Sequence, residues 1–561
     1  MKKSCGMKMF LAASAGLCLV LGASMAAAAP PVGTADTVTA DPPVARPSTT
    51  PCTVKLFSGL TFADFSPKSF SYAPPASCKG PWGKVVFAAD FAVTAGRQYD
   101  RTASIWVGGA NIYFGTTQEP SRTVSPTWHV ERDVTDYSAL FAESHGGQVE
   151  LGNLVNMTYT GVISGSAELI FYPVERHRRA PRTPDAVLPL SAGPSGGAVG
   201  LATTSSRLAQ TFTLPTNVES AYLDVYAQSQ SGDEFWFTCV PSDVAATVQS
   251  CEGTAFREAQ ITIDGQPAGV APIYPWIFTG GIDPYLWRPI PGVQTLQFLP
   301  YRVDLTPFAG VLSNGKPHEV AVSVFNANNY FAATASLLLY RDAGAAKVTG
   351  AVTMNTLHTS PSPVVKKNLN TATAGVVTGD ISVASSRRFV IAGYVQTSHG
   401  RVRTEVAQEI GFTSKQSFDI AADKYVQDIK QRTRIQSLTK TSVGFGLPRE
   451  TLQHFDWPLD LKFAYVTNPD GTAGQTTSVR QSYESRELQS IAGLPIRFST
   501  VSNTVSPRDT LTFDAAGAFT GNKDWTSTQH YFAADSGGSC YSKHITTSGG
   551  LTTAITTGDD C

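Results

Sequence analysis

The chain has 561 residues, which is more than one hydrophobic core can serve, so we expect about three domains. Charged residues make up only 16% of the chain, the formal net charge is −1, and the sequence contains no basic run. These values argue against a protein that binds nucleic acid. Ser, Thr, Val, Gly and Pro are abundant, whereas helical stretches rich in Glu and Lys are few, and this composition favours an all-β fold.

The first 29 residues have the pattern of a secretion signal. Three lysines in the first eight residues precede an apolar run at 9–20, and small residues follow up to Ala29. We expect cleavage near Ala29 and a mature protein that is periplasmic or secreted. A membrane anchor is the alternative reading, but the apolar run is short for a spanning helix and ends in cleavable small residues.

Cysteine usage fits an oxidising compartment. Two of the eight cysteines lie in the predicted signal, and the other six form three close pairs in the sequence. We predict the disulfides Cys52–Cys78, Cys239–Cys251 and Cys540–Cys561, although six cysteines allow fifteen connectivities. No CxxC, HxxxH or HExxH spacing occurs, so we expect neither a metal nor another cofactor.

The rest of the chain divides into regions of different composition. Residues 30–50 are rich in Pro, Thr and Ala without periodicity, which is typical of a flexible leader. Short β runs separated by turn residues predict one β-sandwich at 51–178 and a second, related one at 200–345. Basic residues followed by Gly and Pro between these blocks, at 175–200, indicate a linker. Alternating polar strands at 346–561 predict a third, β-rich region whose role is unclear.

Acidic residues set among aromatic ones are the candidates for catalysis. Three stretches have this pattern: Tyr99-Asp100-Arg101, GDEFWF at 232–237 and GGIDPYLWRPIPG at 280–292. A carboxyl group beside a hydrophobic ring loses water and its pKa rises, which suits a group that gives or takes a proton. The alternative is that these residues form ion pairs at strand ends and aromatic packing in the core.

Longer strings between residues 50 and 345 carry a resemblance to a known family. Among them are GRQYDR (96–101), IWVGGANIYFGTTQEPSRT (105–123), VERDVTDYSALF (130–141), LGNLVNMTYTGV (151–162), GDEFWF (232–237), FREAQITIDG (256–265) and FTGGIDPYLWRPI (278–290). They resemble the acid-active peptide-N4-(N-acetyl-β-glucosaminyl)asparagine amidases of the PNGase A type. The resemblance implies a glycoamidase that acts on N-glycopeptides or N-glycoproteins. Such an enzyme releases the whole N-glycan and converts the asparagine to aspartate.

A second, more distant resemblance, to glycoamidases of the PNGase F type, implies fold and roles. It implies two tandem jelly-roll-like antiparallel β-sandwiches with the site at their junction, here followed by the C-terminal β-rich region. By position, Asp100 is similar to the principal catalytic residue. Glu234 is expected as the second acid, with Glu252 as the alternative. No carboxylate stands in register with a third acidic residue of that type, and Asn153 or Glu150 is the nearest substitute.

The remaining predicted site residues are expected to bind substrate: Tyr99, Arg101, Asn153, Trp236, Trp287 and Arg288. We expect a monomer that binds neither nucleic acid nor, after removal of the signal, a membrane. Two other functions remain open on the sequence alone. An endoglycosidase also uses paired carboxylates among aromatic residues, and a non-catalytic glycan-binding β-sandwich protein would bind glycopeptide without giving a product.

Overall fold

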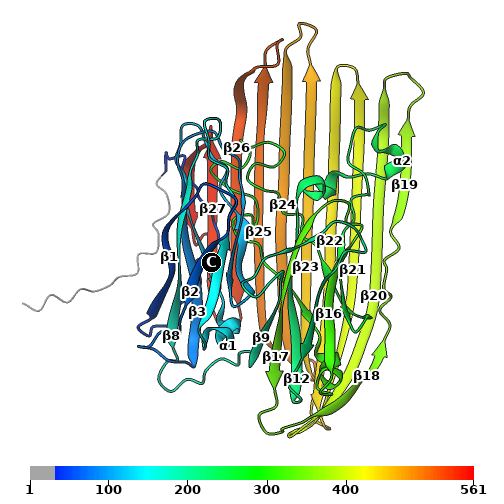
Figure 1. Cartoon of the computed structure of the whole chain (residues 1–561). Coiled ribbons are helices and arrows are strands. Elements are labelled where there is room, and N and C mark those ends of the chain that lie inside the picture. Colours follow the sequence, from blue (N-terminus) through cyan, green and yellow to red (C-terminus); the bar gives the residue numbers. More distant parts are fainter. Residues whose placement is uncertain (1–31) are drawn as a thin grey trace, which may run out of the picture.

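The computed structural model describes residues 32–561, so the predicted signal peptide at 1–29 lies outside the described residues. Almost all of the regular structure is antiparallel β-sheet, which builds two sandwiches and one large sheet (Figure 1). The all-β prediction is therefore confirmed. Within residues 32–561, the helices are all too short or too polar to cross a membrane.

The first sandwich has the strand order of a jelly roll. One sheet has the order β1-β8-β3-β6 and the other the order β2-β7-β4-β5. Large apolar side chains on the facing sides of the two sheets, such as Phe87 and Ile105, form one buried core. The strands and helix are β1 (Cys52–Phe62), β2 (Lys68–Tyr72), β3 (Trp82–Val93), β4 (Thr102–Val107), β5 (Ala110–Thr116), β6 (Thr127–Asp133), α1 (Ser138–Phe141), β7 (His145–Glu150) and β8 (Ile163–Pro173).

The second sandwich repeats this order, with sheets β10-β17-β12-β15 and β11-β16-β13-β14. A further strand, β9, pairs with β17, so part of the segment that we predicted as a linker belongs to this sandwich. The domain begins near residue 186 rather than 200. Its elements are β9 (Ala186–Leu190), β10 (Val199–Leu201), β11 (Leu208–Thr213), β12 (Val218–Ser229), α2 (Ser242–Ala245), β13 (Glu258–Ile263), β14 (Gln266–Pro272), β15 (Tyr301–Asp304), α3 (Ala309–Leu312), β16 (Pro317–Phe325) and β17 (Phe331–Arg341).

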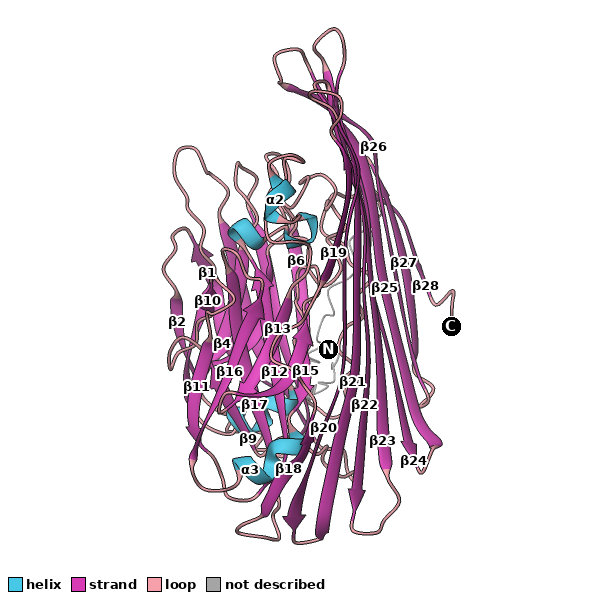
Figure 2. Ribbon diagram, turned by 90° about the vertical axis from the view of Figure 1, so that its right-hand side faces the viewer, coloured by secondary structure: helices cyan, strands magenta, loops and turns pink. Residues whose placement is uncertain are grey.

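The C-terminal region forms a single 11-stranded antiparallel sheet that stands beside the sandwiches like a wall (Figure 2). Side chains alternate along its strands, and the apolar set, including Trp457 and Leu459, packs against the second sandwich. We call this side the inner face. The strands are β18 (Thr349–Asn355), β19 (Val364–Asn370), β20 (Val377–Thr397), β21 (Gly400–Ala421), β22 (Lys424–Val443), β23 (Arg449–Thr467), β24 (Ala473–Ile491), β25 (Leu494–Phe513), β26 (Phe519–Asp535), β27 (Cys540–Ser548) and β28 (Leu551–Thr557).

The segment before the first sandwich is packed, contrary to the prediction of a flexible leader. Val38 and Ala40 are buried in the core between the second sandwich and the large sheet. The Val38 N–H donates to the carbonyl of Pro289 (3.1 Å), and the Ala40 N–H donates to the Gln529 side chain (2.7 Å). The sequence of this segment has no hydrophobic periodicity because its residues form single hydrogen bonds with several different partners instead of joining a sheet.

All three predicted disulfides are present. Cys52–Cys78 ties β1 to the segment before β3, and Cys239–Cys251 closes a loop of the second sandwich. Cys540–Cys561 fastens the C-terminus to the start of β27. Each joins residues no more than 26 positions apart, so the bonds secure local loops rather than distant domains.

Three glycines allow the second sandwich to approach the large sheet closely. Gly310 of α3 lies against Gly350 of β18, and a Cβ on either would overlap the other's backbone. A Cβ on Gly393 of β20 would overlap the carbonyl of Pro307, just before α3. The contact is therefore backbone against backbone, and a side chain larger than hydrogen has no space there.

The close approach predicts the effect of one methyl group. Gly393→Ala forces the sheet away from α3 and costs about 1–3 kcal/mol, as overpacking does elsewhere. Gly411→Ala on β21 of the same sheet is the matched control, because no atom lies within 4 Å of its Cβ position. The midpoint of thermal unfolding should fall for Gly393→Ala and stay close to wild type for Gly411→Ala. Equal midpoints for the two variants would contradict the described contact.

Candidate active site

A long loop of the second sandwich, residues 273–300 between β14 and β15, runs along β5 of the first. Its hydrogen bonds to β5 and the residues after it hold the two sandwiches together. They join the Phe298 N–H to the Phe114 carbonyl (2.8 Å), the Thr116 N–H to the Thr295 carbonyl (2.9 Å) and the Thr279 hydroxyl to the Thr117 carbonyl (2.7 Å). Residues just before β4 therefore face this loop.

Asp100 lies at this junction, two residues before β4. Its Oδ2 accepts the backbone N–H of Gly280, from the long loop, at 2.9 Å. A Cβ on Gly280 would lie 2.6 Å from Oδ1 of Asp100 and 2.9 Å from Oε2 of Glu119. Glycine is thus required for the loop to come this close to the two carboxyl groups.

Glu119 is the nearest acidic neighbour of Asp100. Its Oε2 accepts the backbone N–H of Asp100 at 3.1 Å, and its Oε1 lies 3.3 Å from a guanidinium nitrogen of Arg288. The side chain is buried, with the residue only 6% exposed. Arg288 also donates to the backbone carbonyl of Pro120. Glu119 therefore connects the segment that carries Asp100 with the cation from the long loop.

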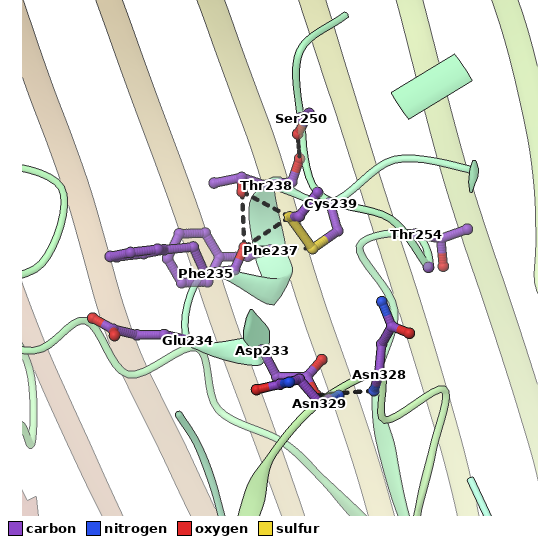
Figure 3. Close-up of a disulfide and its surroundings, with 12 residues drawn as sticks. Asp233, Glu234, Phe235, Phe237, Thr238, Cys239, Ser250, Thr254, Asn328 and Asn329 are labelled. Carbon is purple, nitrogen blue, oxygen red and sulfur yellow. Dashed lines mark hydrogen bonds between the residues drawn. A yellow bond between two sulfur atoms is a disulfide. The ribbon is translucent and has the colours of Figure 1, made fainter. Parts of the chain in front are cut away.

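Glu234 follows a short turn, residues 231–233, whose last residue, Asp233, holds the turn in place. Asp233 is fully buried, forms an ion pair with Arg257 (3.0 Å) and accepts three consecutive backbone N–H groups at residues 328–330. The Cys239–Cys251 disulfide closes the other end of the turn. Figure 3 shows Glu234 and Phe235 extending to the same side of the turn, away from the disulfide. The residue before the candidate acid thus fixes the backbone that positions it.

The three carboxyl groups influence one another's ionisation. Burial raises the pKa of Glu119 to about 8, and the negative charge of Asp100 raises it as well. Burial, followed by the charge of Asp100, raises the pKa of Glu234 to about 7. Burial also raises the pKa of Asp100, but the Gly280 N–H and the charge of Arg101 oppose this rise. Burial thus raises the pKa of all three groups, and the charge of Asp100 adds to the rise at Glu119 and Glu234.

Tyr99 and Arg101 flank Asp100 but differ in exposure. Tyr99 is 48% exposed, and its ring lies 5.6 Å from that of Tyr159, so a flat surface faces solvent beside the carboxyl groups. Arg101 donates to the side chain of Gln98 (2.8 Å), and its guanidinium lies over the Tyr99 ring at 5.9 Å. Both residues remain available to a substrate that reaches Asp100.

Several predicted site residues have a structural position instead. Trp236 and Trp287 are buried in the core, so in this structure their rings present no surface to a substrate. Asn153 is also buried, and its amide donates to the carbonyls of Phe62 (3.0 Å) and Gly161 (3.3 Å). Glu252 is exposed in the loop after Cys251, whereas Glu234 is the acid whose pKa responds to Asp100.

Glu119 was missed, although the sequence contained a signal for it. The glycine pair at 108–109 predicts a tight turn between two buried strands, and the structure pairs Thr102 with Thr116 across this hairpin. Continuing the pairing toward the ends of the strands brings Glu119 beside Tyr99 and Asp100. A carboxylate at 119 was thus predictable as a neighbour of Asp100.

The chain is similar to several known proteins. The family model for peptide N-acetyl-β-D-glucosaminyl asparaginase amidase A matches residues 42–357, more than half of the chain. Peptide-N4-(N-acetyl-β-glucosaminyl)asparagine amidase A of Prunus dulcis is 27% identical over 533 residues, which cover 90% of this chain and 89% of that protein. Among solved structures, PNGase F from Flavobacterium meningosepticum overlaps at a TM-score of 0.35 and 15% identity, over 52% of this chain and 96% of that one. PNGF-II overlaps at a TM-score of 0.36 and 14% identity, over 52% of this chain and 66% of that one. On the family match, the chain belongs to the peptide N-acetyl-β-D-glucosaminyl asparaginase amidase A family.

Proposed function

We propose that this protein is a glycoamidase that hydrolyses the β-aspartylglucosaminyl amide bond of N-glycopeptides and N-glycoproteins. Membership of the amidase A family supports the reaction. The observation that supports this site is a cluster of three carboxyl groups at the junction of the sandwiches: Asp100 accepts the Gly280 N–H (2.9 Å), and the pKa values of Glu234 and Glu119 are raised to about 7 and about 8. Amide hydrolysis needs a base for the water and an acid for the leaving nitrogen, and these groups supply both.

Asp100 is the proposed base. Water adds to the side-chain amide carbon of the glycosylated asparagine, and the Asp100 carboxylate takes the proton that the water loses. The Gly280 N–H fixes the carboxylate through Oδ2 (2.9 Å), which leaves Oδ1 to the water. The product is an aspartate in the peptide.

Glu234 is the proposed acid, and Glu119 is a positioning residue. Glu234 is partly exposed and protonated near neutral pH, so it can reach the substrate and donate to the departing nitrogen. The sugar then leaves as a glycosylamine. Glu119 is too buried for this task, and it orients Asp100 and Arg288 by accepting hydrogen bonds from the Asp100 backbone N–H and from the Arg288 guanidinium.

The two arginines are proposed to stabilise the negative charge that develops on the amide oxygen. Arg101 and Arg288 approach the carboxyl groups from the first and second sandwich respectively. A cation that is already held in place by Gln98 or Glu119 needs little reorganisation when the charge forms. Tyr99 offers its exposed ring to the first sugar. The three disulfides support action in an oxidising compartment such as the periplasm or the extracellular space.

Mass spectrometry of one treated glycopeptide tests the proposed reaction. The wild-type protein should leave a peptide with aspartate and no sugar, and Asp100→Asn should reduce the rate by about 10²–10⁴-fold because the base is lost. Circular dichroism confirms that the variant is folded. A peptide that keeps one N-acetylglucosamine would establish an endoglycosidase, and binding without any product would establish a glycan-binding protein. Wild-type turnover by Asp100→Asn would remove Asp100 from the mechanism.

A paired substitution separates the two candidates for the second acid. Glu234→Gln should lose about 10²–10⁴-fold in kcat, since the amide cannot donate the proton. Glu252→Gln is the matched control and should retain wild-type kcat, because Glu252 is exposed and lies outside the carboxyl cluster. The kcat of both variants is measured on the same glycopeptide. A loss of kcat in Glu252→Gln alone would assign the acid to Glu252.

The raised pKa of Glu119 predicts how its replacement changes stability with pH. The pKa is about 8 in the folded protein and 4.5 in an unperturbed glutamate, so ionisation weakens folding between these values. Glu119→Gln has no proton to lose. The midpoint of thermal unfolding of Glu119→Gln should therefore rise relative to that of the wild type as the pH increases from about 5 to about 8. A constant difference across this range would contradict the raised pKa.

A further inference from the structure

The large sheet carries a row of aromatic rings that begins at the candidate active site. The ring of Tyr285, from the long loop, lies under the guanidinium of Arg288 at 5.4 Å. It stacks on Phe519 of β26 with a centroid distance of 5.4 Å and an interplanar angle of 14°. Phe519 is followed by Phe513 of β25 (6.3 Å) and Phe513 by Tyr465 of β23 (6.2 Å). We call Tyr285, Phe519, Phe513 and Tyr465 the aromatic row.

The row lies on the inner face of the sheet. Tyr465 is in step with the core residues Trp457 and Leu459 on β23, and Phe513 is in step with Val505 on β25. Phe513 and Phe519 are direct backbone partners. These residues lie next to the hairpins that join β23 to β24 and β25 to β26, which rise above the sandwiches in orange and brown at the top of Figure 1. The sandwich core therefore does not cover this end of the row.

The rings remain partly exposed although they are large and apolar. Phe519 is 48% exposed, and Tyr285, Phe513 and Tyr465 are half-buried. A group of exposed aromatic rings at one place indicates a binding surface. Its position next to Arg288, which contacts Glu119, makes it continuous with the carboxyl cluster.

The long loop is fastened to the sheet so that the row stays aligned with the site. Asp283 accepts the amide of Gln475 on β24 (3.1 Å), and Trp525 of β26 packs edge-on against Tyr285 at 5.4 Å. Burial, followed by the negative charge of Asp283, raises the pKa of Asp509 on β25 to about 7. Asp283 and Tyr285 thus bind the loop to β24 and β26 of the sheet.

Resting on the proposed function, we propose that the aromatic row is an extended subsite for the outer sugars of the N-glycan. Sugar rings carry C–H groups on one face that pack on flat aromatic rings, and the centroids of adjacent rings in the row lie 5.4 to 6.3 Å apart. The row is formed by neutral side chains, which suits a neutral glycan more than a charged peptide. The C-terminal sheet would then select substrates by the length of the glycan.

Binding of a free glycan tests the subsite without turnover. In the Asp100→Asn background, isothermal titration calorimetry with a free oligomannose glycan that has the complete chitobiose core should show binding. Phe519→Ala should weaken it about tenfold, whereas Phe519→Tyr keeps the flat ring and should bind as tightly as the parent. Phe498→Ala is the matched control, because Phe498 is 50% exposed on the same sheet but at the opposite end of β25. Equal affinities for Phe519→Ala and Phe498→Ala would overturn the proposal.

Turnover separates this subsite from the catalytic centre. The ratio of kcat/KM between a peptide with the full oligomannose glycan and the same peptide with chitobiose alone should fall about tenfold in Phe519→Ala. An equal loss of kcat/KM on both substrates would mean that Phe519 acts through Tyr285 and Arg288. A loss of kcat/KM that depends on the length of the peptide would mean that the aromatic row binds the peptide. Either outcome overturns the proposal. If Phe519→Ala weakens glycan binding as predicted but the wild type releases no glycan from the glycopeptide, the amidase function fails and the subsite stands.

Discussion

The hydrogen bond from the Gly280 N–H to Asp100 is the interaction on which the site depends. It joins the segment before β4 in the first sandwich to the long loop of the second, at 2.9 Å. A Cβ at 280 would overlap both Asp100 and Glu119, which shows how closely the loop approaches the two carboxyl groups. The three groups form one site only because the loop lies close to β5. The hydrogen bonds along β5 hold the loop from one side, and the large sheet holds it from the other through Asp283 and Tyr285. The candidate site is thus assembled from three parts of the chain.

This closeness has an electrostatic consequence. Three carboxyl groups with little access to water do not all ionise near neutral pH, and in the proposed mechanism Asp100 carries the charge while Glu119 and Glu234 keep their protons. The same arrangement weakens folding as the pH rises, since the unfolded chain ionises freely. The proposed pairing of a base with an acid is therefore obtained at a cost in stability. The buried Asp233–Arg257 pair below Glu234 and the disulfide beside it keep the turn in place.

Much of this was predictable from the sequence. Alternating strands and turn residues identified both sandwiches, the spacing of cysteines gave the three disulfides, and a polar tripeptide before a buried strand located Asp100. The aromatic residues were harder, because Trp236, in the core, and Tyr285, beside the site, look alike in sequence. Burial of a ring depends on contacts with strands hundreds of residues away. The segment 32–50 was mistaken for a flexible leader for the same reason, since its partners, such as Gln529, are distant in the chain.

The central claim is that Asp100 carries a charge while its neighbours remain protonated. Difference infrared spectroscopy of carboxyl groups during a pH titration tests it directly, with Glu119→Gln and Glu234→Gln used to assign the bands. We predict protonated bands of both glutamates that persist to a pH of about 7, and a fall in both pKa values when Asp100→Asn removes the neighbouring charge. Ordinary titration of all three groups near 4, or pKa values that do not respond to Asp100→Asn, would contradict the account.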